Sequence, residues 1–245
     1  MIVHTQSTSN TIWAVVPLKS PDAAKSRLRV RLDGDARRLL FFSMARHVMR
    51  TLAHTPGIAG VSVVTASPEV GAFAEREGAA VIWEERDAGT AEACRSAVAH
   101  FSTSADSLLM ISGDIPLIST ETVATLLSCA GTPPRPLPGR PSSERKAEIY
   151  VVIVPDRRRS GTNALLCSPP AIIPPCFGAD SFARHLAAAH SQGVEVRIVE
   201  SGALALDIDE LEDLDELQRR LDGDPTLLSP ELRAALLRRA EAPAE

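Results

Sequence analysis

Short apolar runs alternate with amphipathic segments along almost the whole of this 245-residue chain, and this rhythm restricts the fold more than any other feature. The apolar runs are continuous and rich in β-branched residues, as is typical of strands buried on both faces of a sheet. The segments between them carry apolar residues at helical spacing. The alternation predicts an α/β fold with a mainly parallel sheet flanked by helices.

The limits of the expected elements follow from these patterns and from the turn residues between them. Strands or extended pieces are expected at Ile12–Pro17, Val61–Thr65, Ala79–Trp83, Ser107–Ser112, Ile149–Val154, Asn163–Cys167, Val194–Val199 and Ala203–Leu206. Helices are expected at Asp35–His54, Pro68–Glu77, Thr90–Phe101, Thr120–Cys129, Ser181–His190, Glu210–Leu221 and Pro230–Ala240.

One stretch, Gly131–Lys146, interrupts the rhythm with Pro, Gly, Ser and Arg residues. We interpret 131–147 as a surface loop inserted into a single domain that covers 12–222. A disordered tail is expected at 1–11, and a C-terminal helix and tail at 223–245. The alternative is that the stretch links to a second core of about 100 residues, a size within the usual range of domains.

Charge and cysteine content exclude several classes of function. The chain has 26 Lys and Arg against 31 Asp and Glu, so its net charge of -5 argues against nucleic acid or an anionic membrane as partner. Its four cysteines show no CxxC spacing, which favours a reducing cytoplasm over a disulfide scaffold or a zinc site. No apolar stretch reaches the roughly 20 residues of a membrane span. We expect a cytoplasmic protein.

The loop after the first expected strand gathers positive charge in an acidic protein. Lys19, Lys25 and Arg27 lie there, and ligands of such sheets bind beyond the carboxyl ends of the strands. Three cations suit a polyphosphate, although the GxxxxGK[ST] pattern of a Walker loop is missing. A solvated loop leading into a helix explains the segment equally well.

Carboxylates stand at two other strand ends. Asp114 directly follows an apolar strand, where a carboxylate is costly unless a partner such as Mg²⁺ compensates its charge. Asp207 and Asp209 alternate on an expected extended piece and so share a face, where a divalent cation would relieve their repulsion. The alternatives are a turn or a helix N-cap for Asp114 and, for Asp209, a cap on the helix that starts at Glu210.

Small and positively charged residues mark a third region. Arg157–Arg159 follow the fifth strand, and Gly178 and Ser181 stand at a helix start, where backbone N–H groups can face an anion. His185 and His190 lie in the middle of a helix, and we assign them no role.

Taken in order, these segments resemble the CofC/FbiD family of guanylyltransferases, which act in the biosynthesis of coenzyme F-420. The resemblance implies a Rossmann-like GT-A nucleotidyltransferase fold. It also implies transfer of GMP from GTP to phosphoenolpyruvate, 2-phospho-L-lactate or 3-phospho-D-glycerate, with release of pyrophosphate. The matching stretches are WAVVPLKSPDAAKSRL (13–28), SGDIPLI (112–118), PDRRRSGTNALL (155–166), FGADSFARHLAAA (177–189) and LDIDELEDL (206–214).

The resemblance also implies roles for individual residues. The phosphorylated acid would be held by Thr162, Gly178 and Ser181, and Arg27 and Asn163 would also bind substrate. Mg²⁺ would be held by Asp114, Asp207 and Asp209. Lys19, Lys25 and Asp114 would act in catalysis. The product would pass to the transferase acting on the deazaflavin precursor, and a homodimer is left open.

Two departures from the family pattern concern the substrates. Ala91 replaces an Asn, which makes Glu92 a candidate acceptor for guanine N–H groups. Arg159-Ser160-Gly161-Thr162-Asn163 stands where the family has GTGTN, so the acceptor loop is expected to differ in shape.

Other classes of protein remain as alternatives. One is a sugar-nucleotide or molybdopterin nucleotidyltransferase, but the Gly-rich first loop of those enzymes is missing here. A glycosyltransferase would favour a DxD after a mid-chain strand, whereas the only DxD after an expected extended segment is at 207–209. A non-catalytic nucleotide-binding protein would use the same carboxylates as caps.

Overall fold

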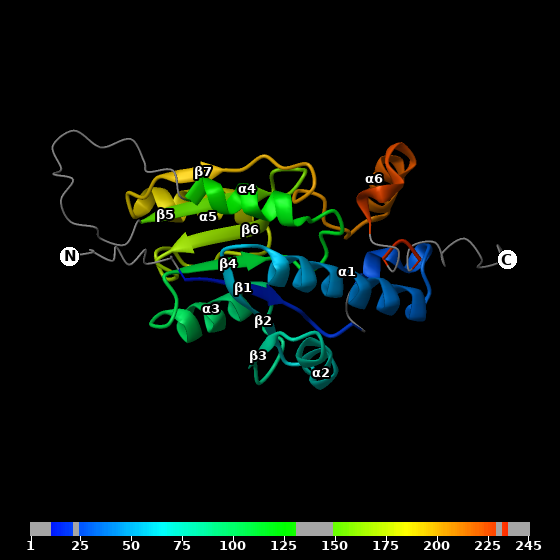
Figure 1. Ribbon diagram of the computed structural model, residues 1–245, viewed down its shortest axis with the longest axis horizontal. Coiled ribbons are helices and arrows are strands. Elements are labelled where there is room, and N and C mark those ends of the chain that lie inside the picture. The colour runs from blue at the N-terminus through cyan, green and yellow to red at the C-terminus, as the bar shows by residue number, and fades with distance from the viewer. Residues whose placement is uncertain (1–10, 22–24, 131–148, 229–231, 235–245) are drawn as a thin grey trace, which may run out of the picture.

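A seven-stranded sheet in the order β3-β2-β1-β4-β6-β5-β7 forms the centre of the molecule (Figure 1). The computed structural model describes residues 11–21, 25–130, 149–228 and 232–234. The strands are β1 (Ile12–Pro17), β2 (Ile58–Thr65), β3 (Ala80–Trp83), β4 (Ser107–Ile111), β5 (Tyr150–Pro155), β6 (Thr162–Ser168) and β7 (Val196–Ile198).

All neighbouring strands are parallel except at β6, which runs antiparallel to both β4 and β5. Pro155, the last residue of β5, pairs with Thr162, the first of β6. The amino end of β6 therefore lies at the same edge of the sheet as the carboxyl ends of β1 and β4. This reversal brings Thr162 and Asn163 to the edge where such sheets bind ligands.

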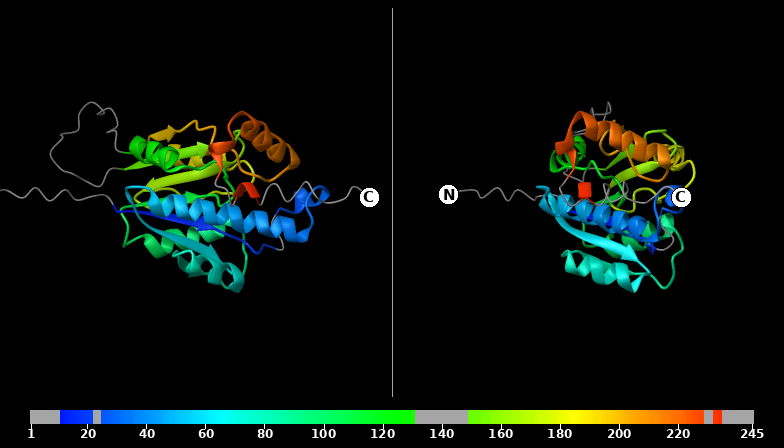
Figure 2. Two further views of the ribbon diagram at one scale, coloured as in Figure 1. Left: turned by 45° about the vertical axis from the view of Figure 1, so that its right-hand side comes forward. Right: turned by 90° about the vertical axis from the view of Figure 1, so that its right-hand side faces the viewer.

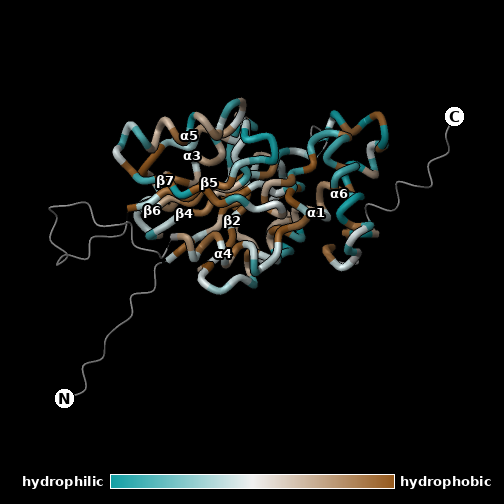
Figure 3. The backbone as a smooth tube through the Cα atoms, turned by 90° about the horizontal axis from the view of Figure 1, so that it is seen from above, coloured by the Kyte–Doolittle hydropathy of each residue, from teal (hydrophilic) through white to brown (hydrophobic). Residues whose placement is uncertain are grey.

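Helices cover both faces of the sheet (Figure 2). Alternate residues of β1 belong to opposite cores, because Ala14 and Val16 pack in one cluster and Val15 in the other. The first core includes α1 (Gly34–His54), α2 (Pro68–Arg76) and α4 (Thr120–Ala130), and the second includes α3 (Thr90–Phe101) and α5 (Ser181–Ser191). Figure 3 shows the strands between the helices as the most hydrophobic part of the chain.

Side-chain caps fix the starts of two helices. The Asp33 carboxylate accepts the Ala36 N–H at 2.7 Å at the start of α1. Ser67 accepts from Val70, and Pro68 takes the first helical position of α2, where its missing N–H costs nothing.

A third apolar cluster lies beyond the carboxyl ends of β1 and β4, where α6 (Leu211–Gly223) is seen in Figure 1. It joins α6 to the 3-10 turn η1 (Ser26–Val30) and to Leu228, which directly follows a second 3-10 turn, η2 (Pro225–Leu227). Leu28 packs here with Leu228 and Leu232, so residues beyond 222 pack on the same core as the first loop. The division at 222 stays a prediction.

The expected α/β architecture with a mainly parallel sheet is confirmed. The expected extended piece Asn163–Cys167 is confirmed and is part of the seven-residue strand β6. One local expectation was wrong, because Ala203–Leu206 is a turn rather than an extended piece. Leu204 and Leu206 are buried alternately as on a strand, but Ala205 N–H donates back to Ser201 at 2.8 Å.

Several predictions concern residues outside the described ranges. These are the tail at 1–10, the loop at 131–147 and most of the expected helix Pro230–Ala240, of which 232–234 are described and helical. Within the described ranges, no helix combines the length and apolarity needed to cross a bilayer.

Gly113 allows the ends of β1 and β4 to approach closely, which leads to a prediction. A Cβ at Gly113 would lie 2.5 Å from Leu18 Cδ2 and 3.1 Å from Val16 Cγ1. Gly113→Ala should therefore lower the free energy of unfolding by about 1–3 kcal/mol, as overpacking does. Urea denaturation measures this. Gly34→Ala, where a Cβ meets nothing within 4 Å, is the control, and equal stability of the two variants would contradict the prediction.

Candidate active site

A cleft of about 870 Å³ opens at the carboxyl ends of β1, β4 and β5 and at the amino end of β6. A smaller hollow of about 270 Å³ adjoins it at the carboxyl ends of β1 and β2 and the start of α3. Pro17, Leu18, Lys19 and Thr90 line both spaces. The site therefore has two compartments, with the loop after β1 between them.

Lys25 and three carboxylates meet in the larger compartment. The Lys25 ammonium group donates one hydrogen bond to Asp114 and a second one, of 3.0 Å, to Asp209. The Lys25 side chain is only 5% exposed and its backbone is left-handed, with φ of 56°. A non-glycine residue in this conformation is held by its surroundings, here by the two ion pairs.

The protonation of this group follows from its charges. Burial alone would lower the pKa of Lys25, but Asp114 and Asp209 raise it well above its usual value. Burial acts to raise the pKa of Asp209, yet the Lys25 ammonium holds it below the usual range. Burial, together with the Asp114 and Asp209 charges, raises the pKa of Asp207 to about 7. One ammonium group thus compensates two carboxylates and leaves the third without a cation.

Asn163 places Asp207 in this group. Its amide donates to Leu204 O at 3.0 Å and to the Asp207 carboxylate at 3.2 Å, while Ile208 N–H donates to Asp114 O at 3.1 Å. A turn held by these bonds replaces the expected strand and still brings Asp207 and Asp209 close to Asp114.

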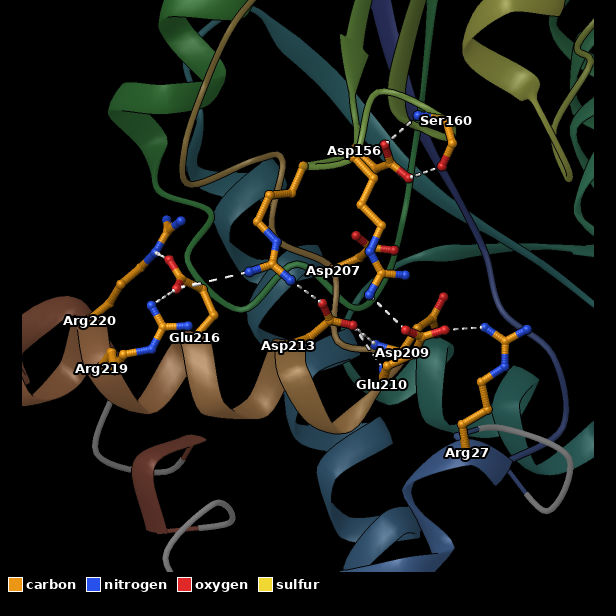
Figure 4. A network of polar contacts seen from close by, with 12 residues as sticks. Arg27, Asp156, Ser160, Asp207, Asp209, Glu210, Asp213, Glu216, Arg219 and Arg220 are labelled. Atoms are coloured by element: carbon orange, nitrogen blue, oxygen red, sulfur yellow. Dashed lines mark hydrogen bonds and ion pairs between the residues drawn. The ribbon is translucent and has the colours of Figure 1, made fainter.

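Arginine side chains surround the carboxylates (Figure 4). Glu210 accepts hydrogen bonds from both Arg27, at 2.9 Å, and Arg158, at 2.7 Å. Arg157 donates to Asp213 at 2.8 Å, and Asp213 accepts the Glu210 N–H in the capping box of α6. The suggestion that Asp209 caps this helix is wrong, because Glu210 is the capping residue.

Four of the substrate-binding residues expected from the sequence also line the cleft. They are Thr162 and Asn163 on β6 and Gly178 and Ser181 before and at the start of α5. The backbone turns at Gly178 with φ of 114°. Ser181 N–H donates to Gly178 O at 3.2 Å, so it is already used. The N–H groups of Gly178, Ala179 and Asp180 donate to no residue in the described parts of the chain, which leaves them for an anion.

The smaller hollow carries the carboxylates of Glu84 and Asp87. Lys19 Nζ lies 4.0 Å from Asp87, whereas no described residue donates a hydrogen bond to the Glu84 side chain. Partial burial and the charges of Asp87 and Glu92 raise the pKa of Glu84. Glu92, the acceptor suggested from the sequence, does not line the hollow and pairs with Arg95.

The carboxylates of Asp114, Asp207 and Asp209 are the candidate ligands for a metal ion in this cleft. As they stand, no three His, Cys, Asp or Glu side chains among the described residues are placed to hold one. Lys25 Nζ lies between Asp114 and Asp209, which accounts for the separation of these two carboxylates. The chemistry of the set fits a divalent cation nevertheless, since three hard carboxylates share one positive side chain.

Comparisons with known proteins agree with this architecture. A family model described as the MobA-like NTP transferase domain matches residues 25–243. The chain belongs to this family. Phosphoenolpyruvate guanylyltransferase of Conexibacter woesei is 38% identical over 84% of this chain and 86% of its own length. The enzyme of that name from Rubrobacter xylanophilus is 39% identical over 85% and 94%.

Like other MobA-like NTP transferases, the chain is a nucleotidyltransferase, and its relatives confirm the resemblance to guanylyltransferases found in the sequence. A structure from Desulfovibrio desulfuricans that bears the name nucleotide-diphospho-sugar transferase matches with a TM-score of 0.72 at 16% identity. The match covers 94% of this chain and 95% of the other, which supports the GT-A-like fold.

The structure brings all the site residues expected in this MobA-like NTP transferase to one cleft. Three contributions were missed. Glu84 follows a short edge strand, so nothing in the sequence showed that it turns into the hollow. Glu210 was seen only as a helix start. His185 was set aside as a mid-helix residue, although its spacing of four from Ser181 places both on one side of α5.

The Lys25 ion pairs generate a prediction. Lys25→Met should lower the free energy of unfolding at pH 7 by about 2 kcal/mol, because it leaves carboxylates in the cleft without their cation. The deficit should shrink below about pH 4, where aspartates take up protons. Urea denaturation across this pH range measures both effects.

Lys19→Met is the matched control, since Lys19 is half exposed and 4.0 Å from its partner. Adding Asp114→Asn to Lys25→Met should restore part of the loss. A Lys25→Met protein as stable as the Lys19→Met protein would show that the ion pairs contribute nothing.

Proposed function

We propose that this nucleotidyltransferase transfers GMP from GTP to phosphoenolpyruvate, with release of pyrophosphate. One observation carries the proposal. The carboxylates of Asp114, Asp207 and Asp209 line a compartment suited to a small anion, and a hollow suited to a nucleobase adjoins this compartment. Two relatives that are 38% and 39% identical bear the name phosphoenolpyruvate guanylyltransferase, which supports GTP and phosphoenolpyruvate as the substrates.

The nucleotide is placed by charge and shape. The base enters the smaller hollow, and the triphosphate crosses the loop after β1 beside Lys19. Arg27 and Arg158 face the same cleft and are available to phosphate oxygens once these replace Glu210 as their partner. Positive charge at this point compensates the developing charge of the leaving pyrophosphate.

Guanine is selected by Glu84 in this proposal. Guanine presents adjacent N1–H and N2–H donors, which match the two oxygens of one carboxylate. Glu84 lines the hollow, and its carboxylate accepts no hydrogen bond from a described residue. Its pKa is raised, so hydrogen bonds from guanine would stabilise its charged form.

Mg²⁺ would be held by Asp114, Asp207 and Asp209, and it would supply charge neutralisation at the phosphates. The chain's own residues position the reactants. Lys25 holds Asp114 and Asp209 in place, and Asn163 orients Asp207.

The acceptor binds between Thr162 and the loop before α5, where Gly178, Ala179 and Asp180 offer free N–H groups. Its phosphate is already ionised at neutral pH, so no general base is needed. An oxygen of that phosphate bonds to the α-phosphorus as the bond from that phosphorus to the bridging β-phosphate oxygen breaks. Catalysis is then positioning and charge neutralisation.

The F-420 pathway and the alternative acceptors 2-phospho-L-lactate and 3-phospho-D-glycerate rest on the sequence resemblance, and a cytoplasmic location rests on the cysteine content. The product joins two phosphates as an anhydride, which suits consumption by a second transferase. A single experiment tests the reaction. The purified chain is incubated with GTP, Mg²⁺ and each of the three acids, and pyrophosphate is measured. Phosphoenolpyruvate should give the highest kcat/KM. Binding of GTP without pyrophosphate release would favour a non-catalytic nucleotide-binding protein.

Asp114 provides the first kinetic prediction. Asp114→Asn should lower kcat/KM at least 100-fold, an effect typical of losing one group that stabilises charge in the transition state. Asp222→Asn, an exposed change on α6, is the control. Unfolding curves of both variants show whether the fold is intact. A folded Asp114→Asn protein with near-normal turnover would overturn the role of Asp114.

Glu84 provides the second kinetic prediction. Glu84→Gln keeps the size but offers only one acceptor oxygen, so KM for GTP should rise about 10-fold and the preference for GTP over ATP should narrow. Initial rates with both nucleotides measure this. Glu85→Gln, which alters an exposed neighbour, should leave both values unchanged. An unaltered preference in Glu84→Gln would place the base elsewhere.

A further inference from the structure

His185 is a fully buried polar residue that the reaction described above does not use. It lies on α5, is 0% exposed, and packs its ring edge-on against Phe177 with centroids 5.0 Å apart. A buried imidazole needs hydrogen-bond partners on its nitrogens. His185 has one hydrogen-bond partner at each nitrogen: a backbone N–H at Nε2 and a hydroxyl group at Nδ1.

The first partner fixes the tautomer. Cys176 N–H donates to His185 Nε2 at 2.7 Å, and a backbone N–H can only donate. Nε2 is therefore the unprotonated nitrogen, and the ring proton is on Nδ1.

The second partner follows from the first. His185 Nδ1 lies 3.0 Å from Thr162 Oγ1, so the Nδ1–H donates to the hydroxyl oxygen. Thr162 cannot donate back to Nδ1, and no other described residue accepts from this hydroxyl. Thr162 lines the cleft, so its hydroxyl hydrogen, which has no acceptor in the described parts of the chain, is left for a ligand there.

We propose that His185 is a positioning residue that turns the Thr162 hydroxyl into a donor directed at an anionic oxygen of the acceptor in the cleft. This rests on the proposed function, which places the phosphorylated acid beside Thr162. Without the imidazole, the hydroxyl could instead act as an acceptor, and an acceptor facing an anion would repel it. The hydrogen bonds from Cys176 N–H to His185 and from His185 to Thr162 thus keep the Thr162 hydroxyl as a donor towards the cleft.

The surroundings of His185 keep its imidazole neutral near neutral pH, so the direction of its hydrogen bond to Thr162 does not change there. Burial, and to a smaller extent the Arg184 charge, lower the pKa of His185 to about 4. A second ring proton would sit on Nε2, opposite the Cys176 N–H. In the unfolded chain the imidazole takes up a proton near pH 6.5, so the folded state loses stability as the pH falls from about 6.5 to about 4.

Two substitutions distinguish the roles of the two imidazole nitrogens of His185. His185→Asn places an amide near the position of Nδ1 and can still donate to Thr162. His185→Gln places its amide near Nε2, keeping an acceptor for Cys176 N–H but losing the donor to Thr162. With GTP and phosphoenolpyruvate, His185→Gln should raise KM for phosphoenolpyruvate about 10-fold, the effect of about one hydrogen bond, and leave KM for GTP within about twofold. His185→Asn should stay within about threefold of the wild type for both substrates.

A double-variant cycle shows whether His185 acts through Thr162. Thr162→Val alone should also raise KM for phosphoenolpyruvate more than KM for GTP. If the hydroxyl is the route, adding His185→Gln to Thr162→Val should change KM for phosphoenolpyruvate by less than about twofold. Full additivity, or an equal rise in both KM values, would overturn the proposal and indicate a merely structural role.

A measurement without turnover tests the tautomer in the wild-type protein. Imidazole ¹⁵N chemical shifts from NMR should show His185 neutral and protonated on Nδ1 at pH 7, and His185→Gln should reduce the loss of stability between pH 6.5 and 4. A proton on Nε2 would overturn the proposal even if turnover is normal. If wild-type protein releases no pyrophosphate with any of the three acids, the proposed function fails, and the NMR result alone decides the orientation of Thr162.

Discussion

The charge balance around Lys25 is the constraint on which the site depends. One ammonium group joins the loop after β1 to the end of β4 and to the turn before α6, three segments far apart in the sequence. Its two ion pairs allow three carboxylates to lie together in a partly buried cleft, which would otherwise be prevented by their repulsion. The same arrangement leaves Asp207 with a raised pKa and without a cation of its own. In the proposed function, the side chains whose ion pairs hold this cleft together are thus also those that would hold the divalent ion.

The reversed strand β6 gives this sheet its second compartment. A fully parallel strand would begin at the opposite edge, and its first residues would lie far from the carboxyl end of β4. Because β6 is antiparallel, Thr162 and Asn163 begin at the edge where β4 ends. Asn163 then orients Asp207, and His185 orients Thr162. The half of the sheet from β3 to β4 keeps the parallel arrangement and carries the hollow with Glu84.

Much of this could be predicted from the sequence, because burial and strand ends leave local patterns. The continuous run before Asp114 indicated a buried strand, and its position at the carboxyl end indicated a site. The turn at 203–206 has the alternating pattern of a strand, since Leu204 and Leu206 are both buried. Its backbone is held instead by a hydrogen bond from the Asn163 side chain to Leu204 O. Lys25 was expected at the phosphates, and its contacts with Asp114 and Asp209 depend on side chains that only the folded chain brings together. The same holds for His185, whose role depends on the direction of one backbone N–H.

Glu210 has a consequence for how nucleotide affinity responds to salt. Its carboxylate is bonded to both Arg27 and Arg158 before any substrate arrives. A polyphosphate that binds these arginines exchanges one anionic partner for another and releases few condensed ions from the solution. Counterion release is what makes the binding of highly charged ligands steeply dependent on ionic strength. Under the proposed function, the affinity of the cleft for its nucleotide is therefore expected to depend only weakly on ionic strength.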